Sequence, residues 1–411
     1  MRAPRRRTFP ARILCGASIA VLSATPLALV AQASPGADAP KPPVVFGDRG
    51  IVFNGADGFT YLALRFRVQE WAVFSSDDSD PQIERTHLAV RRARFRFESV
   101  VWDPRLKVNV QFSFSRGDQD FENSNFPNVL RDANFTWQAT PRLAITAGQG
   151  KLPGNRQRVT SSGELQFPDR SIVNAAFTLD RDVGVVATYA VMSGGVPFTL
   201  FAAVTGGEGR NASSGDAGLA YTGRIELKPL GVFGAGGDYF EGDLIREMDP
   251  KLSVGIGYSH NERAMRTGGQ LGKPLFEPRT MTTALADVLF KYRGFAASAE
   301  LARRQAPDPF TTDGTDTRYI LVGDGLSVQA SYLTRRNLEP AIRVSIVQPH
   351  RDLSGLSGAD RQRQTSFGLT RYLKGHRVKF QNELMRDDFY NSFNQARRQS
   401  WSLRSSFEVG I

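Results

Sequence analysis

The chain has 411 residues, of which 41% are hydrophobic and 23% charged, and its formal net charge is +11. Its single cysteine, Cys15, excludes a disulfide framework, a cysteine-based zinc cluster and a cysteine nucleophile. The four histidines are scattered and none stands in a recognisable catalytic motif, so we expect no enzyme and no cofactor. After residue 33, no stretch is apolar over the roughly 18 residues that a transmembrane helix needs.

The first 33 residues have the layout of a secretory signal peptide. A basic start is followed by mainly apolar or small residues over 13–30, and then by Ala31-Gln32-Ala33, which matches an A-x-A cleavage site. A retained membrane helix is the alternative, and the polar residues and Pro26 within it argue against that. Cleavage would remove five arginines and no acid, leaving 47 basic against 41 acidic residues and a net charge of +6.

The mature chain divides into a short extension and one long β-region. Residues 34–57 are rich in proline, glycine and aspartate, which predicts a flexible N-terminal extension with a short strand at 51–54. Over 58–411, short segments alternate between apolar and polar residues, and a period of two is typical of β-strands. In 92–97, Ala93, Phe95 and Phe97 alternate with arginines. Apolar and polar residues alternate in the same way over 62–68 and 106–114.

We count sixteen such segments. They lie near 59–74, 85–101, 105–115, 130–138, 142–150, 182–190, 197–205, 217–228, 251–260, 281–291, 294–304, 326–335, 338–348, 364–373, 376–386 and 400–411. An added pair near 230–241 and 316–322 would make eighteen. Tight turns alternate with long polar loops, which is typical of an outer-membrane β-barrel. A soluble β-sandwich is the alternative, but a dry core could not bury Arg224, Glu226 and Arg343 without partners.

The arginines set the orientation of the strands. One arginine facing lipid near the middle of the bilayer costs about 2–4 kcal/mol. Five of them lie on the polar faces of the first two strands: Arg65, Arg67, Arg92, Arg94 and Arg96. Facing lipid, they would together approach the stability of a whole domain, about 5–15 kcal/mol. They must therefore face the lumen. Arg91 breaks the alternation, so we expect either a β-bulge that turns Arg91 and Arg92 inward or a place for Arg91 at the membrane rim.

The sequence thus predicts an all-β protein, a transmembrane antiparallel β-barrel of sixteen strands with eighteen as the alternative. Its last strand would close against the first, so that no edge is left unpaired.

Several segments, in their order and spacing, resemble the phosphate-selective porins O and P. They are Leu64-Arg65-Phe66-Arg67-Val68-Gln69, Val90-Arg91-Arg92-Ala93-Arg94, Leu130-Arg131-Asp132-Ala133-Asn134, Gly148-Gln149-Gly150-Lys151 with Arg158-Val159-Thr160-Ser161-Ser162, and Arg181-Asp182-Val183-Gly184-Val185. The resemblance runs through most of the mature chain and is clearest over 59–190. Arg94 stands where close family members have an aromatic hydroxyl, and Arg158 where they have lysine. Both keep or add positive charge, so anion preference is implied more firmly than phosphate specificity.

The resemblance implies a homotrimer of sixteen-stranded barrels in the outer membrane of a Gram-negative bacterium. A loop would fold into each lumen as a constriction, and a ladder of arginines would draw phosphate or other anions inward. By position, the anion-binding residues would be Arg67, Arg91, Arg92, Asp132, Arg158, Ser161 and Ser162. The pore would also be lined by Arg65, Arg94, Arg96, Lys107 and Lys151.

These residue types suit an anion channel. A cationic ring in a narrow pore selects anions, and a guanidinium group donates two parallel hydrogen bonds to a phosphate. We therefore predict passive, anion-selective diffusion, with phosphate or polyphosphate as the expected class. The alternative is a structural or adhesive outer-membrane barrel whose lumen is plugged. The expected partners are small anions, outer-membrane lipid and further copies of the chain, and no nucleic acid, because the aromatic residues face away from the basic ones.

Overall fold

The computed structural model describes residues 42–47, 50–77, 80–119, 128–212, 218–391 and 393–411. The predicted signal peptide, 1–33, and the first part of the predicted extension lie outside these residues. Within the described ranges, no helix has the length and apolarity needed to cross a membrane.

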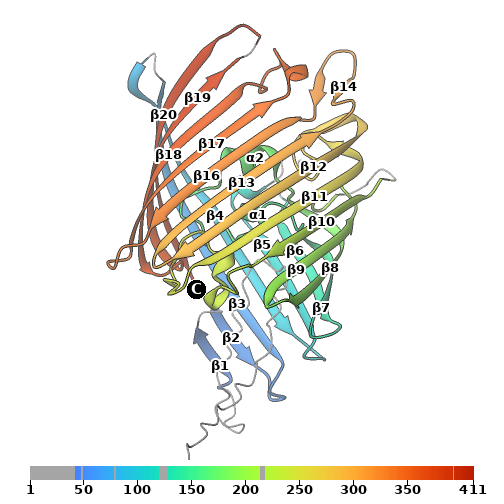
Figure 1. The fold of residues 1–411 in the computed structure, drawn as a ribbon, viewed down its shortest axis with the longest axis vertical. Coiled ribbons are helices and arrows are strands. Elements are labelled where there is room, and N and C mark those ends of the chain that lie inside the picture. The colour runs from blue at the N-terminus through green and yellow to red at the C-terminus, as the bar shows by residue number, and fades with distance from the viewer. Residues whose placement is uncertain (1–41, 48–49, 78–79, 120–127, 213–217, 392) are drawn as a thin grey trace, which may run out of the picture.

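Sixteen antiparallel strands form the wall of a barrel (Figure 1). In chain order they are β3 (Tyr61–Asp77), β4 (Asp80–Val100), β5 (Leu106–Ser113), β6 (Leu130–Gln138), β7 (Leu143–Lys151), β8 (Arg181–Ser193), β9 (Val196–Thr205), β10 (Ala220–Leu227), β11 (Lys251–Arg266), β12 (Pro274–Tyr292), β13 (Phe295–Gln305), β16 (Gly323–Tyr332), β17 (Leu338–Pro349), β18 (Arg361–Lys374), β19 (Val378–Tyr390) and β20 (Arg397–Gly410). Each pairs with the next, and β20 returns to pair with β3, where Gly410 lies opposite Arg67. The predicted sixteen-stranded closed barrel is confirmed.

Two further strands extend the sheet at the rim that carries the C-terminus, the lower rim in Figure 1. Strand β1 (Val44–Gly47) pairs with β2 (Gly50–Asn54), and β2 pairs with the first residues of β3, where Ile51 lies opposite Leu64. The strand predicted at 51–54 is therefore present as β2.

The eighteen-strand alternative placed its extra pair wrongly. Residues 230–241 contain a short 3-10 helix, η2 (Gly234–Tyr239), because Ala235 and Gly236 adopt positive φ angles that interrupt an extended strand. In the other segment, β15 (Thr317–Tyr319) forms only a two-stranded ladder with β14 (Phe310–Thr312), separate from the wall. Two more 3-10 helices are η1 (Arg116–Asp118) and η3 (Arg351–Leu353).

Strand β10 shows the inward and outward faces of the wall clearly. Along β10, Arg224 and Glu226 are buried, with Arg224 only 3% exposed, whereas Ile225 is 45% exposed. This is the pattern expected where the outer surface meets hydrocarbon and the inner surface is polar.

The interruption at Arg91 is a β-bulge. Gln69 of β3 lies opposite Arg92, and the next residue, Glu70, lies opposite Val90, so Arg91 has no partner in the ladder. Arg91 and Arg92 both reach the carboxylate of Asp169. The bulge, rather than a rim position for Arg91, is therefore the correct prediction: it lets two adjacent arginines act on the same side of the wall.

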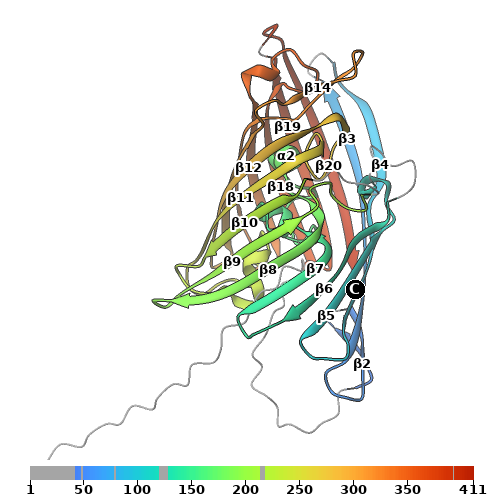
Figure 2. The same cartoon turned by 90° about the vertical axis from the view of Figure 1, so that its right-hand side faces the viewer.

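Residues 152–180, here the inner segment, connect β7 to β8 and contain the short helices α1 (Arg156–Val159) and α2 (Ile172–Phe177). Both helices lie behind the near wall in Figure 1, and in Figure 2 they are again framed by strands. Apolar residues of the segment, including Val173 and Phe177, form a buried cluster with Leu285 of β12, Ala302 of β13 and Val347 of β17.

Two glycines of the wall leave room for aromatic rings of the inner segment. A Cβ on Gly325 would lie 2.8 Å from the Phe177 ring, and one on Gly368 would lie 2.7 Å from the Phe167 ring. Since real Cβ atoms do not approach so closely, glycine at both positions allows the rings to contact the strand backbone.

Candidate functional site

The best-formed group of predicted site residues gathers around Ser162 of the inner segment. The hydroxyl of Ser162 accepts hydrogen bonds from Arg67 Nη2 at 2.6 Å and from Arg94 Nη1 at 2.7 Å. Arg67 comes from β3 and Arg94 from β4, and the two lie directly opposite each other in the ladder. One neutral oxygen thus joins two guanidinium groups from adjacent strands.

A cavity of about 160 Å³ lies beside this contact. Five arginines line it: Arg65 and Arg67 from β3, Arg94 and Arg96 from β4, and Arg377 from the turn between β18 and β19. We call it the four-arginine cavity after the four that lie on β3 and β4. Ser161 of the inner segment also lines it. The space is large enough for several water molecules or for a small hydrated anion.

The register makes the charge density of this cavity unusual. Arg65 lies opposite Arg96, and Arg67 lies opposite Arg94. Like charges directly opposite each other on neighbouring strands destabilise a sheet. Four carboxylates reduce the cost: Glu98 lies 3.2 Å from Arg96, Asp118 lies 2.6 Å from Arg94, Glu408 lies 3.5 Å from Arg67, and Glu164 of the inner segment lines the cavity itself.

Arg91 and Arg92 belong to a second group, around Asp169. Asp169 Oδ1 accepts a hydrogen bond from Arg92 Nη2 at 2.6 Å, and Asp169 Oδ2 accepts one from Arg91 Nη2 at 3.0 Å. Burial alone would raise the pKa of Asp169, but the charges of Arg92 and Arg91 outweigh it and hold that pKa below its ordinary value. The carboxylate is therefore ionised in neutral solution.

The remaining predicted anion residues form a third group at the two ends of the inner segment. Asp132 of β6 accepts two hydrogen bonds from Arg181, at 2.8 and 3.2 Å. Arg158 pairs with Asp180, whose Oδ1 also lies 3.3 Å from Arg181. The Asp132–Arg181 pair thus joins two strands of the wall, and the Arg158–Asp180 pair joins the two ends of the inner segment to each other.

The two predicted pore-lining lysines lie apart from the four-arginine cavity. Lys151 donates to the carbonyl oxygens of Val159 at 3.0 Å and Thr160 at 3.3 Å, and so supports the inner segment. Lys107 of β5 lies opposite Val100 in the ladder and is not among the described residues that line the cavity.

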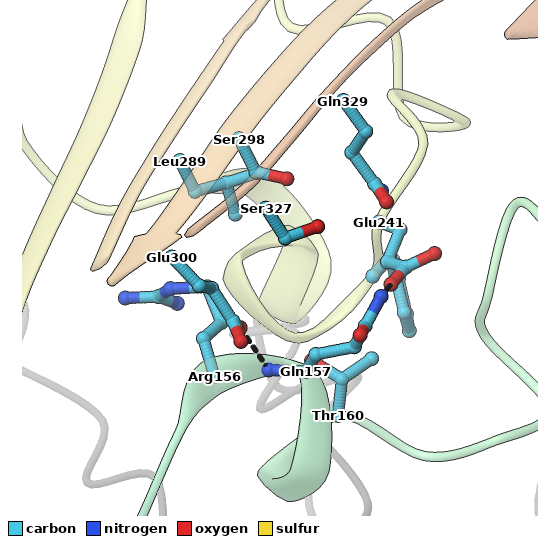
Figure 3. A pocket seen from close by; sticks show the side chains of 10 residues that line it. Arg156, Gln157, Thr160, Glu241, Leu289, Ser298, Glu300, Ser327 and Gln329 are labelled. Atoms are coloured by element: carbon cyan, nitrogen blue, oxygen red, sulfur yellow. Dashed lines mark hydrogen bonds between the residues drawn. The ribbon is translucent and has the colours of Figure 1, made fainter. Parts of the chain in front are cut away.

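The opposite side of the inner segment is closely packed against the wall. A pocket of only about 20 Å³, room for about one water molecule, separates α1 from β13 and β16 (Figure 3). Gln157 bridges it, with its backbone N–H donating to Glu300 and its side chain donating to Glu241 at 2.8 Å. Of these two spaces the four-arginine cavity is the larger. A third, of about 350 Å³, lies where β13 ends and β16 begins, between residues such as Arg304 and Gly323.

Some functional residues carried no signal in the sequence. Asp118 and Asp169 lie in polar connections, where an isolated aspartate looks like any solvated loop residue. Glu408 is different, because strict alternation places it on the inner face of the last strand, where it is 1% exposed.

The model of the phosphate-selective porins O and P matches residues 64–275, about half of the chain. The chain belongs to this family. No curated protein sequence matches it. The protein is an outer-membrane channel protein of a Gram-negative bacterium, as its family and its barrel indicate.

Solved porin structures share the fold. The outer-membrane channel DcaP of Acinetobacter baumannii is 11% identical, with a TM-score of 0.51 over 87% of this chain and 99% of that chain. The anion-selective porin from Comamonas acidovorans is 10% identical, with a TM-score of 0.51 over 86% and 100%. OmpF of Salmonella typhi, solved with daunomycin, is 14% identical, with a TM-score of 0.51 over 85% and 98%. At such identities the likeness concerns the fold alone.

Proposed function

We propose that the protein is a passive, anion-selective channel and that the four-arginine cavity is its anion site. The observation that carries the proposal is the register, in which Arg65 and Arg67 lie directly opposite Arg96 and Arg94. Such an arrangement costs stability, and an anion in the cavity would relieve the repulsion. Small anions, with phosphate or polyphosphate as the expected class, would be the permeating species.

The chemistry of the lining supports this proposal. Guanidinium groups are always charged and donate in the planar geometry that carboxylate and phosphate oxygens accept. A narrow pore with low-dielectric walls strengthens the field of such charges. The hydroxyl group of Ser161 adds a neutral donor to the lining, and that of Ser162 accepts from Arg67 and Arg94 beside it.

In this account the inner segment is the constriction. Beside α1 the space toward β13 and β16 holds only about one water molecule, so at this level ions would pass on the side of β3 and β4. Of the residues expected to bind the anion, we assign direct contact to Arg67, Ser161 and Ser162. Arg158 would act by holding the two ends of the segment together, and Asp132 by fixing Arg181 of the wall beside them.

One observation favours the alternative function, a structural barrel with a plugged lumen. Buried cations of the wall donate to carbonyl oxygens of the inner segment: Lys379 to Gly163 at 2.8 Å, and Arg304 to Ala176 at 2.9 Å. With the apolar cluster around Phe177, they hold the segment firmly in place. A plug needs such anchoring, and so does a rigid constriction.

We also propose that the mature chain begins at Ser34 and assembles as a homotrimer in outer-membrane lipid, as the family resemblance implies. Residues 1–41 lie outside the described part of the chain, so this assignment rests on the sequence.

Recording in planar lipid bilayers tests the function. In a potassium chloride gradient, the reversal potential of the purified protein is expected to favour chloride, and added phosphate is expected to reduce the chloride current. A preference for potassium would contradict the proposal. A silent protein that inserts correctly would favour the plugged barrel.

A further inference from the structure

Two carboxylates that do not belong to the barrel wall lie among its arginines. Asp118 comes from η1, in the connection between β5 and β6, and Asp169 comes from the inner segment. Arg91 joins them, with Nη1 3.5 Å from Asp118 and Nη2 3.0 Å from Asp169. The chain thus brings its own anions to the arginines that are expected to attract solute anions.

Asp118 lies at the centre of its own set of donors. Arg94 lies 2.6 Å from Asp118 Oδ2, Arg131 lies 3.4 Å from Oδ1, and Ser113 donates its hydroxyl to Oδ2 at 2.6 Å. With Arg91, three guanidinium groups surround a single carboxylate. Arg94 also lines the four-arginine cavity, whereas Asp118 does not. The carboxylate of Asp118 therefore balances part of the charge of Arg94 from outside the cavity.

At the second group the carboxylate is the more accessible partner. The side chain of Asp169 is 21% exposed, whereas that of Arg92 is 1% exposed; the second arginine of the group, Arg91, is 18% exposed. A solute anion approaching this group would therefore meet a negative charge before it reached the guanidinium group of Arg92. The positive charge of Arg92 is present but screened.

Asp169 is fixed in this position from two sides of the barrel. Its carboxylate is held by β4 through Arg91 and Arg92, and its backbone oxygen accepts a hydrogen bond from Arg343 of β17 at 3.0 Å. The preceding residue, Pro168, accepts another from Gln69 of β3 at 3.0 Å. The carboxylate is thus part of the rigid packing.

We propose that Asp118 and Asp169 are specificity-determining residues of the channel, which act as tethered counter-anions. They balance part of the arginine charge, so that small anions are attracted but bound weakly enough to be released. Conduction needs such release, because a site that binds too tightly blocks the pore. This inference rests on the proposed anion-channel function. It adds that the two aspartates limit the affinity of the anion site.

Single isosteric substitutions test this inference. Asp169→Asn and Asp118→Asn each remove one negative charge and keep the size of the side chain. A unit charge about 8 Å from an ion changes the occupancy of that ion about two- to threefold even at the dielectric constant of water. We expect each variant to raise the chloride-to-potassium permeability ratio by about threefold and to lower the phosphate concentration for half-block by a similar factor.

Asp103→Asn is the matched control, because Asp103 lies in the turn between β4 and β5 at the lower rim and pairs with Arg105, which is 54% exposed. It removes the same charge and is expected to leave the ratio unchanged. An unchanged or lower ratio in the Asp169 and Asp118 variants would overturn the inference, and so would a larger conductance without a change in selectivity, because that indicates a purely structural role. Since the two aspartates lie in different segments, failed assembly of one variant leaves the other as the test. A wild-type preference for potassium would instead contradict the proposed function itself.

Discussion

We predict that weakening the packing of Phe177 increases the current, because we propose that the inner segment is the constriction of the pore. Phe177 is 1% exposed, contacts Gly325 of β16 and lies in the apolar cluster between α2 and the wall. Phe177→Ala would leave a cavity there, and such truncations cost about 3–5 kcal/mol. Because the wall keeps all its strand pairings, we expect the loss to fall on the seating of the inner segment and the barrel to remain closed. The segment would then leave its position for a measurable fraction of the time.

Single-channel recording measures this effect. Phe177→Ala is expected to show a larger mean conductance with frequent transitions between levels, whereas its circular dichroism spectrum stays that of the wild type. Phe407→Ala is the control, because Phe407 of β20 is 45% exposed on the outer face and makes no part of the cluster. A Phe177→Ala channel with the conductance and quiet trace of the wild type would refute the view that the inner segment sets the width of the pore.

Three other predictions follow from the same geometry. Gly368→Val would place a Cβ 2.7 Å from the Phe167 ring and should also raise conductance in bilayer recordings. Gly223→Val is the control, because its Cβ would lie 3.9 Å from the Phe201 carbonyl oxygen, and it should leave the conductance unchanged. Equal effects of the two variants would count against a role of Phe167 in holding the inner segment. Asp132→Asn weakens a buried ion pair between β6 and β8 and should lower the free energy of unfolding in urea by about 3 kcal/mol. An unchanged midpoint would show that this pair does not stabilise the wall. The anion-to-cation permeability ratio should fall as salt rises from about 0.01 M to about 1 M, because the screening length falls from about 30 Å to about 3 Å; a ratio independent of salt would place selectivity in size rather than charge.

The strands of the wall can largely be predicted from the sequence, because each strand has one face toward hydrocarbon and the other toward the polar interior. That constraint imposes a period of two, and it located all sixteen strands and the inward direction of Arg92, Arg94 and Arg96. It also gave the two possible explanations of the extra residue at Arg91, of which the register selects the bulge.

The inner segment is much harder to predict, because no such constraint acts on it. Its position depends on contacts between residues far apart in the chain, such as Lys379 with the carbonyl oxygen of Gly163 and Arg343 with that of Asp169. A carbonyl acceptor has no sequence signature, and a loop aspartate has almost none. For this reason the predicted anion residues fall into three groups rather than one.

The most direct test of the central claim is the reversal potential of a channel that has lost charge only in the four-arginine cavity. Arg67→Gln combined with Arg96→Gln removes one guanidinium group from each cross-strand pair and leaves the group around Asp169 intact. In a potassium chloride gradient, we expect the reversal potential to move from the chloride side toward zero. An unchanged preference for chloride in an assembled channel would contradict it.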